Sequence, residues 1–114
     1  MIIEKKSDLK LAREEVATVL ADAPEVVLDM ADIPQERVKP IKAVMAERGV
    51  GGASRIVAED LLRDVAIYGS PEEVALDLRS LEKYGIDETI FGPPYGREPA
   101  KAVREMTEAW KRST

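Results

Sequence analysis

The chain has 114 residues, of which 45% are hydrophobic and 34% charged, enough for one modest core and too short for two ordinary domains. Acidic residues outnumber basic ones by 22 to 17, and the two signs are interspersed along the chain, which excludes a nucleic-acid partner. The absence of cysteine and histidine excludes disulfides, thiol chemistry, the usual zinc sites and imidazole catalysis.

No apolar run approaches the roughly 20 residues needed to cross a bilayer, and residues 1–6 are too short and too charged for a signal peptide. We therefore expect a cytoplasmic protein with no membrane partner. No pair of carboxylates shows the spacing of a metal site, so we expect no metal. Residues 1–114 are predicted to form a single domain or a fragment of one.

The first half of the chain is predicted to be helical. Ser7-Asp8 is typical of a helix cap, and the apolar residues of 9–20 recur every three or four positions, as on one helix face. Short helices are predicted after Pro24 and after Pro34, the latter beginning late or bending because Pro40 lies inside it. Residues 49–52 contain three glycines and are the candidate hinge.

The second half predicts strand, helix, strand, helix, an order typical of parallel α/β structure. The apolar run 65–68 could be a strand or the end of a helix. Ser70-Pro71-Glu72-Glu73 predicts a helix start with a capping box, and Gly85 is suited to end that helix. Residues 86–91 read as a second strand, and Pro99 opens a last helix with an apolar face that includes Trp110.

Two turns are candidate sites because each follows a predicted strand. Gly69-Ser70 could bind a phosphate at the start of a helix, or Ser70 and Glu73 could simply cap that helix, which accounts for every residue there. The loop Gly92-Pro93-Pro94-Tyr95-Gly96-Arg97 could line a pocket, or it could be a rigid turn into the last helix.

Residues 64–74, 81–85 and 86–94 together resemble the closing segment of the luciferase-like family, and the closest branch is the methylenetetrahydromethanopterin reductases with their deazaflavin-dependent relatives. Residues 7–20 and 23–24 also resemble a stretch of that family further upstream. The resemblance implies an α/β fold that is mainly helical by residue count. It would be the C-terminal portion of a TIM barrel, with two or three short parallel strands.

The resemblance also implies hydride chemistry with coenzyme F420, a deazaflavin, or with FMN. The implied cofactor-binding residues belong to the two turns: Gly69, Ser70, Gly92, Pro93, Pro94 and Gly96. No catalytic residue can be assigned. Because the family's long N-terminal portion is missing, we expect a fragment or subunit of an oxidoreductase that is not catalytically competent alone and could bind no cofactor by itself.

The alternative is a non-catalytic interaction module that self-associates or completes a partner's barrel. The expected partner is accordingly a second copy of this chain, or a chain that supplies the missing barrel portion.

Overall fold

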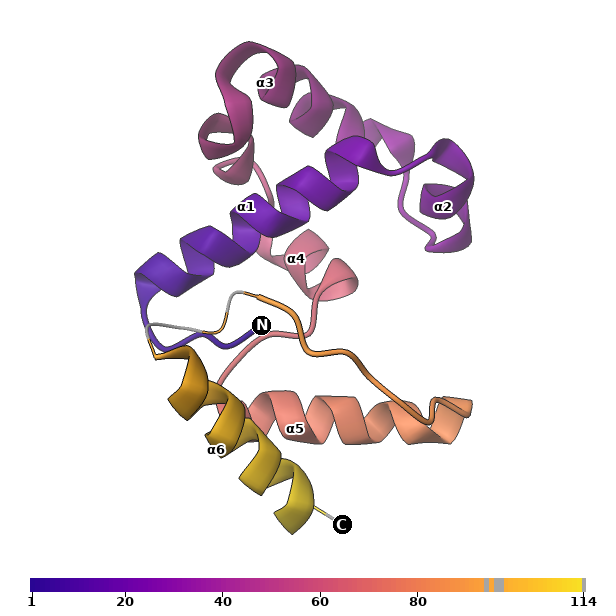
Figure 1. Cartoon of the computed structure of the whole chain (residues 1–114). Helices are drawn as coiled ribbons and strands as arrows, with labels where there is room; N and C mark the ends of the chain where they lie inside the picture. Colours follow the sequence, from indigo (N-terminus) through magenta and orange to yellow (C-terminus); the bar gives the residue numbers. More distant parts are fainter. Residues whose placement is uncertain (94, 96–97, 114) are drawn as a thin grey trace. The chain divides into compact units, whose positions relative to one another are not determined.

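A computed structural model describes residues 1–93, 95 and 98–113 of the chain. They belong to two compact units, one made of residues 1–9 and 66–114 and the other of residues 10–65. The helices in chain order (Figure 1) are α1 (Lys6–Asp22), α2 (Glu25–Met30), α3 (Gln35–Ser54), α4 (Glu59–Val65), α5 (Pro71–Ser80), the 3-10 helix η1 (Leu81–Tyr84) and α6 (Pro99–Arg112). None of these helices is long and apolar enough to cross a membrane.

The predicted first helix is confirmed as α1. The carboxylate of Asp8, in its first turn, accepts hydrogen bonds from the backbone amides of Glu4 and Lys5 at 2.9 and 3.0 Å. Asp8 is only 3% exposed, and these two donors stabilise its buried oxygen. The cap therefore fixes the turn that leads into α1.

The unit of residues 10–65, all of which are described, contains most of α1 together with α2, α3 and α4, and no strand. Arg37 of α3 forms an ion pair with Asp60 of α4 at 2.8 Å, and a longer one with Asp64 at 4.0 Å. The buried apolar residues of this unit are Ala12, Val16, Ala17, Leu20, Leu28, Ile33, Val38, Ile41, Ala53, Val57, Leu61 and Leu62. Their burial supplies the main stabilisation, because exposed ion pairs contribute at most about 1 kcal/mol.

Helix α3 differs from the prediction at its proline. It begins at Gln35 and contains Pro40, so the expected late start is wrong. The departure from helical geometry falls instead at Gly49, whose φ of 74° lies in the left-handed region that favours glycine. The hinge at 49–52 stays a prediction.

In the other unit, the start of the chain lies beside Gly69. The amide of Ile3 donates to the Gly69 carbonyl at 2.8 Å, and the Gly69 amide donates to the Met1 carbonyl at 3.2 Å, which makes one isolated parallel bridge. The amino group of Met1 donates to the Ile67 carbonyl at 2.9 Å, and partial burial lowers the pKa of that amino group. These contacts place the Ile2 side chain in the core.

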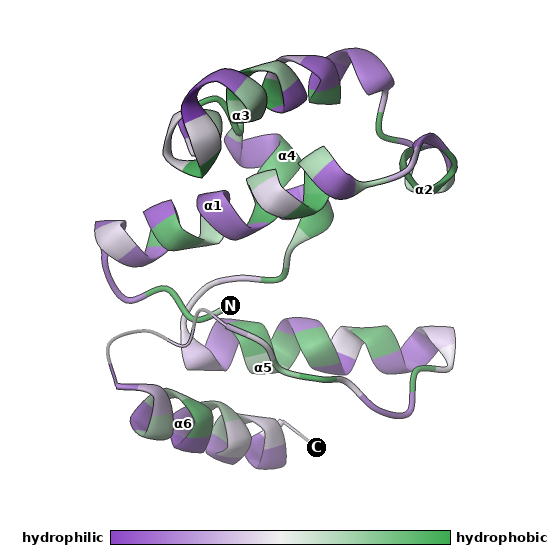
Figure 2. Ribbon diagram, turned by 45° about the horizontal axis from the view of Figure 1, so that its top comes forward, coloured by the Kyte–Doolittle hydropathy of each residue, from purple (hydrophilic) through white to green (hydrophobic). Residues whose placement is uncertain are grey.

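A small hydrophobic cluster surrounds Ile2, with Val74 from α5 and Ala102 from α6. Four half-buried residues pack against it: Ile67, Leu78, Phe91 and Met106. Figure 2 shows hydrophobic and hydrophilic residues alternating along α5 and α6, as expected for helices buried on one side. Helix α6 thus packs on α5 through the apolar face predicted for it.

The α/β prediction is wrong. Over residues 1–93, 95 and 98–113 there is no strand, sheet or partial TIM barrel, and the two or three parallel strands are absent. In the first predicted strand, residue 65 is the last residue of α4, and after it only Gly69 forms a β-bridge, with Ile2. Residues 86–90 make no backbone hydrogen bond with any described residue, and Ile90 is 94% exposed. A strand needs a neighbour for its amides and carbonyls. Residues 86–90 have none among the described residues, and the segment that ends at Gly69 pairs with residues 1–3 through one isolated bridge, which is too short for a sheet.

Candidate functional site

The polar groups of the Gly69-Ser70 turn form hydrogen bonds with other groups of the chain. The Ser70 hydroxyl accepts from the Glu73 amide at 3.2 Å, and a Glu73 carboxylate oxygen accepts from the Ser70 amide at 2.8 Å. This is the predicted capping box, which is confirmed. Pro71 has no amide hydrogen. Of the other amides of residues 69–73, all of which are described, that of Glu72 is the one with no hydrogen-bond acceptor among the described residues.

Gly69 is required by the closeness of Glu73. A Cβ atom at Gly69 would lie 2.5 Å from a carboxylate oxygen of Glu73, and its φ of 150° is rarely adopted by other residues. The glycine therefore lets the Glu73 carboxylate reach the Ser70 amide. A phosphate at this turn would have to displace that carboxylate and would meet the charge of Glu72 as well. The phosphate-binding interpretation of this turn stays a prediction.

Removing the cap should cost a measurable part of the stability. We expect Ser70→Ala to lower the free energy of unfolding by about 1 kcal/mol, because the Glu73 amide loses its acceptor at the start of α5. Urea denaturation followed by Trp110 fluorescence measures this change. Ser70→Asp keeps an acceptor and serves as the matched control. A Ser70→Asp variant as unstable as Ser70→Ala would contradict the role given to the cap.

In the second turn, Tyr95 folds back on the chain. Its hydroxyl donates to the Phe91 carbonyl at 3.2 Å, and the two rings lie 5.3 Å apart at 59°. A Cβ atom at Gly92 would have no heavy atom of the described residues within 4 Å, so no close approach requires glycine there. The contacts between Phe91 and Tyr95 fit the rigid-turn interpretation. Pro94, Gly96 and Arg97 lie outside the described residues.

Both turns border the same hydrophobic cluster. Gly69 is the bridge partner of Ile2, which belongs to that cluster, and Gly92 follows Phe91, which packs against it. Among residues 69–73 the Glu72 amide alone has no acceptor within the described residues, and the two charged side chains there, Glu72 and Glu73, would repel a phosphate.

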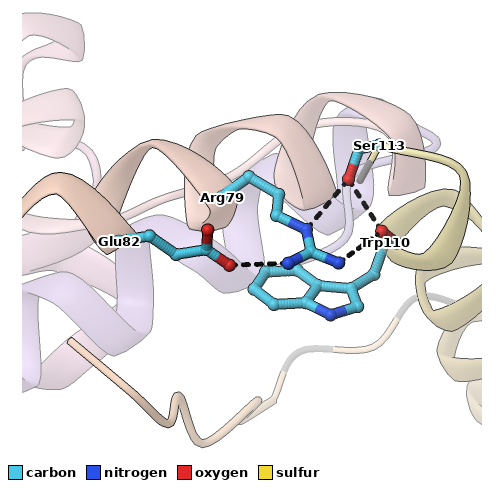
Figure 3. Close-up of polar contacts among 4 residues, drawn as sticks. All are labelled: Arg79, Glu82, Trp110 and Ser113. Carbon is cyan, nitrogen blue, oxygen red and sulfur yellow. Dashed lines mark hydrogen bonds and ion pairs between the residues drawn. The ribbon is translucent and has the colours of Figure 1, made fainter.

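A third feature, which the sequence did not indicate, is the environment of Arg79 (Figure 3). Its guanidinium lies 3.8 Å from the centre of the Trp110 ring and donates to the Trp110 carbonyl at 3.0 Å. It also donates to the Ser113 hydroxyl at 3.2 Å and to the Glu82 carboxylate at 2.6 Å. Among the described residues, its contacts join α5 to η1 through Glu82 and to the end of α6 through Trp110 and Ser113, which indicates a structural role.

The described residues show no arrangement typical of a metal site or of acid–base catalysis. Across the described residues, no three acidic side chains gather closely enough to hold a metal ion. A hollow of about 210 Å³ lies between α5 and α6, lined by Glu72, Leu76, Ala109, Arg112 and Ser113. Its two charged residues are of opposite sign, and nothing in it resembles a proton-transfer pair.

Comparison with known proteins supports the family resemblance at low identity. The chain is 28% identical over 103 residues to the 5,10-methylenetetrahydromethanopterin reductase of Methanopyrus kandleri, which covers 89% of this chain and 30% of the relative. It is 24% identical over 110 residues to the enzyme of the same name from Archaeoglobus fulgidus, covering 91% of this chain and 33% of the relative. No protein-family profile matches.

The chain therefore spans about a third of the length of these curated relatives. It is similar to a section of such reductases over most of its own length. The similarity supports a relation to 5,10-methylenetetrahydromethanopterin reductases at low identity.

Proposed function

We propose that the chain is a section or subunit of a coenzyme F420-dependent oxidoreductase related to methylenetetrahydromethanopterin reductase, and that it is not catalytically competent alone. The similarity to two such reductases over about nine tenths of the chain carries this proposal. In a complete enzyme the coenzyme would supply the hydride chemistry, and this chain would contribute the turns at Gly69-Ser70 and Gly92-Pro93 to the wall of its pocket.

The local geometry is the reason for assigning no activity to the isolated chain. The Ser70 amide is held by Glu73, and both backbone polar groups of Gly69 are bonded to the start of the chain. The remaining donors and the substrate-facing groups would come from a second chain or from another segment of the protein. FMN is the alternative cofactor, and the same turns would face it.

Calorimetry tests the proposal. We expect the isolated chain to give no binding heat with coenzyme F420 or with FMN. We expect coenzyme F420 to bind once the chain is mixed with the Methanopyrus kandleri reductase from which the matched section has been removed. The same trimmed reductase mixed with its own section is the positive control.

If that control binds coenzyme F420 and this chain does not restore binding, the proposal is wrong. A second function would then be favoured, that of a non-catalytic module that binds a protein partner or a second copy. The observation in its favour is the exposure of large apolar side chains, with Met30 at 82% and Ile90 at 94%. Analytical ultracentrifugation of the isolated chain would detect self-association.

A further inference from the structure

The chain between η1 and Phe91 is exposed and contains no helix or strand (Figure 1). Gly85 ends η1 with a φ of 81°, in the left-handed region that glycine readily adopts. Each of residues 86–90 is exposed, and none of their backbone amides or carbonyls bonds to a described residue. These peptide groups are therefore accessible to another protein.

Contacts on both sides hold the ends of this segment. On one side, Glu82 of η1 forms an ion pair with Arg79 of α5 at 2.6 Å. On the other side, Phe91 packs against the hydrophobic cluster around Ile2. Residues 86–90 are thus a short open stretch between two fixed points.

Such a stretch suits the active site of an endoprotease. Proteins that recognise an extended peptide bond to its backbone amides and carbonyls, which a helix has already paired. A helix must therefore open locally before it is cut, whereas an exposed loop is cut first. Glu88 lies at the centre of the open stretch.

We propose that residues 86–90 are a site of proteolytic modification, cut after Glu88 by a glutamate-specific endoprotease, and that the cut chain stays together as two fragments. Hydrolysis breaks the bond between the Glu88 carbonyl carbon and the Thr89 nitrogen. Water adds a hydroxyl to the carbon and a proton to the nitrogen, which leaves a carboxylate and an ammonium group. Both new charges lie on exposed residues, so burial does not oppose them. The proposal is independent of the proposed function.

The other glutamates of the chain, all of which are described, are less open to cleavage. Three glutamates lie outside the α-helices and η1: Glu4, Glu88 and Glu98. The bond after Glu4 is protected because the Lys5 amide donates to the buried carboxylate of Asp8 at 3.0 Å. The bond after Glu98 leads into Pro99, whose ring and missing amide hydrogen hinder cleavage.

The C-terminal fragment keeps long-range contacts after the cut. Ala102 of α6 belongs to the cluster around Ile2, and Met106 packs against it. The Trp110 carbonyl accepts from the Arg79 guanidinium of α5 at 3.0 Å. No residue of the cut segment takes part in these contacts, so they hold the two fragments together.

Brief digestion of the full chain with glutamyl endopeptidase, followed by mass spectrometry, tests the site. We expect residues 1–88 and 89–114 as the first products, eluting together from gel filtration in native buffer and apart in urea. Glu88→Gln should slow the loss of intact chain on the order of tenfold, because the next sites require a helix to open. Glu108→Gln is the matched control, since Glu108 is an exposed glutamate within α6. It should be digested like the parent chain.

Thermolysin, which cuts before large apolar residues, provides a second measurement that does not depend on Glu88. Ile86 and Ile90 are 40% and 94% exposed, and the first cut is expected before one of them. A first cut by either enzyme outside residues 85–91 would overturn the proposal. An unchanged rate in Glu88→Gln, or fragments that separate in native buffer, would overturn it as well.

Discussion

The Ile2→Ala variant is expected to lose about 3 kcal/mol of unfolding free energy. Ile2 is fully buried and forms a hydrophobic cluster with Val74 of α5 and Ala102 of α6. Truncation to alanine removes the apolar contacts and leaves a cavity that backbone hydrogen bonds on both sides of Ile2 keep from collapsing. The effect should therefore exceed that of the Ser70 cap.

Trp110 is the single tryptophan and lies in the same unit as Ile2, so its fluorescence during urea denaturation follows the unfolding of that unit. Ile90→Ala is the matched control, because the same side chain is 94% exposed there and should change stability by less than about 0.5 kcal/mol. Equal losses in the two variants would mean that the cluster around Ile2 does not stabilise the unit.

The sequence predicted those features that depend on neighbours in the chain. The capping box of Ser70 and Glu73 is a contact between residues three apart, and the helical spacing that predicted α1 and α6 is equally local. Such contacts can be predicted from the residue types and their spacing in the chain. They are the part of the fold that was confirmed.

The strands failed because pairing is not local. Residues 86–91 contain β-branched residues and end in an aromatic residue, types that are common in strands, but no described segment lies beside residues 86–90 to accept their hydrogen bonds. The residue types favour an extended backbone, and they carry no information about whether a neighbouring strand is present. The resemblance implied strands that the isolated chain does not form.

The candidate site shows the same division. The sequence predicted that Ser70 caps α5. It could not predict the hydrogen bonds of Gly69 with Met1 and Ile3, because 66 or more positions separate these residues. Arg79 and Trp110 meet across two helices, and nothing local in either segment indicates the contact. Long-range contacts of this kind decide which donors are left for a ligand.

The Arg79→Ala variant should lower the unfolding free energy by about 2 kcal/mol. The change removes a stacked guanidinium and charged hydrogen bonds to Trp110, Ser113 and Glu82, each of which contributes on the order of 1 kcal/mol when partly buried. The side chain of Arg79 is 19% exposed, so water screens these contacts only in part. Helix α6 should lose its attachment to α5 at this end.

Arg79→Lys separates charge from geometry, because lysine keeps the positive charge and lacks the planar fork that reaches Trp110 and Ser113 together. We expect it to recover less than half of the loss. Arg104→Ala is the control, since Arg104 lies exposed on α6 and makes no ion pair with a described residue. Trp110 fluorescence should shift in Arg79→Ala and stay unchanged in Arg104→Ala. If both variants unfold at the same urea concentration as the parent chain, the contacts of Arg79 do not hold α6.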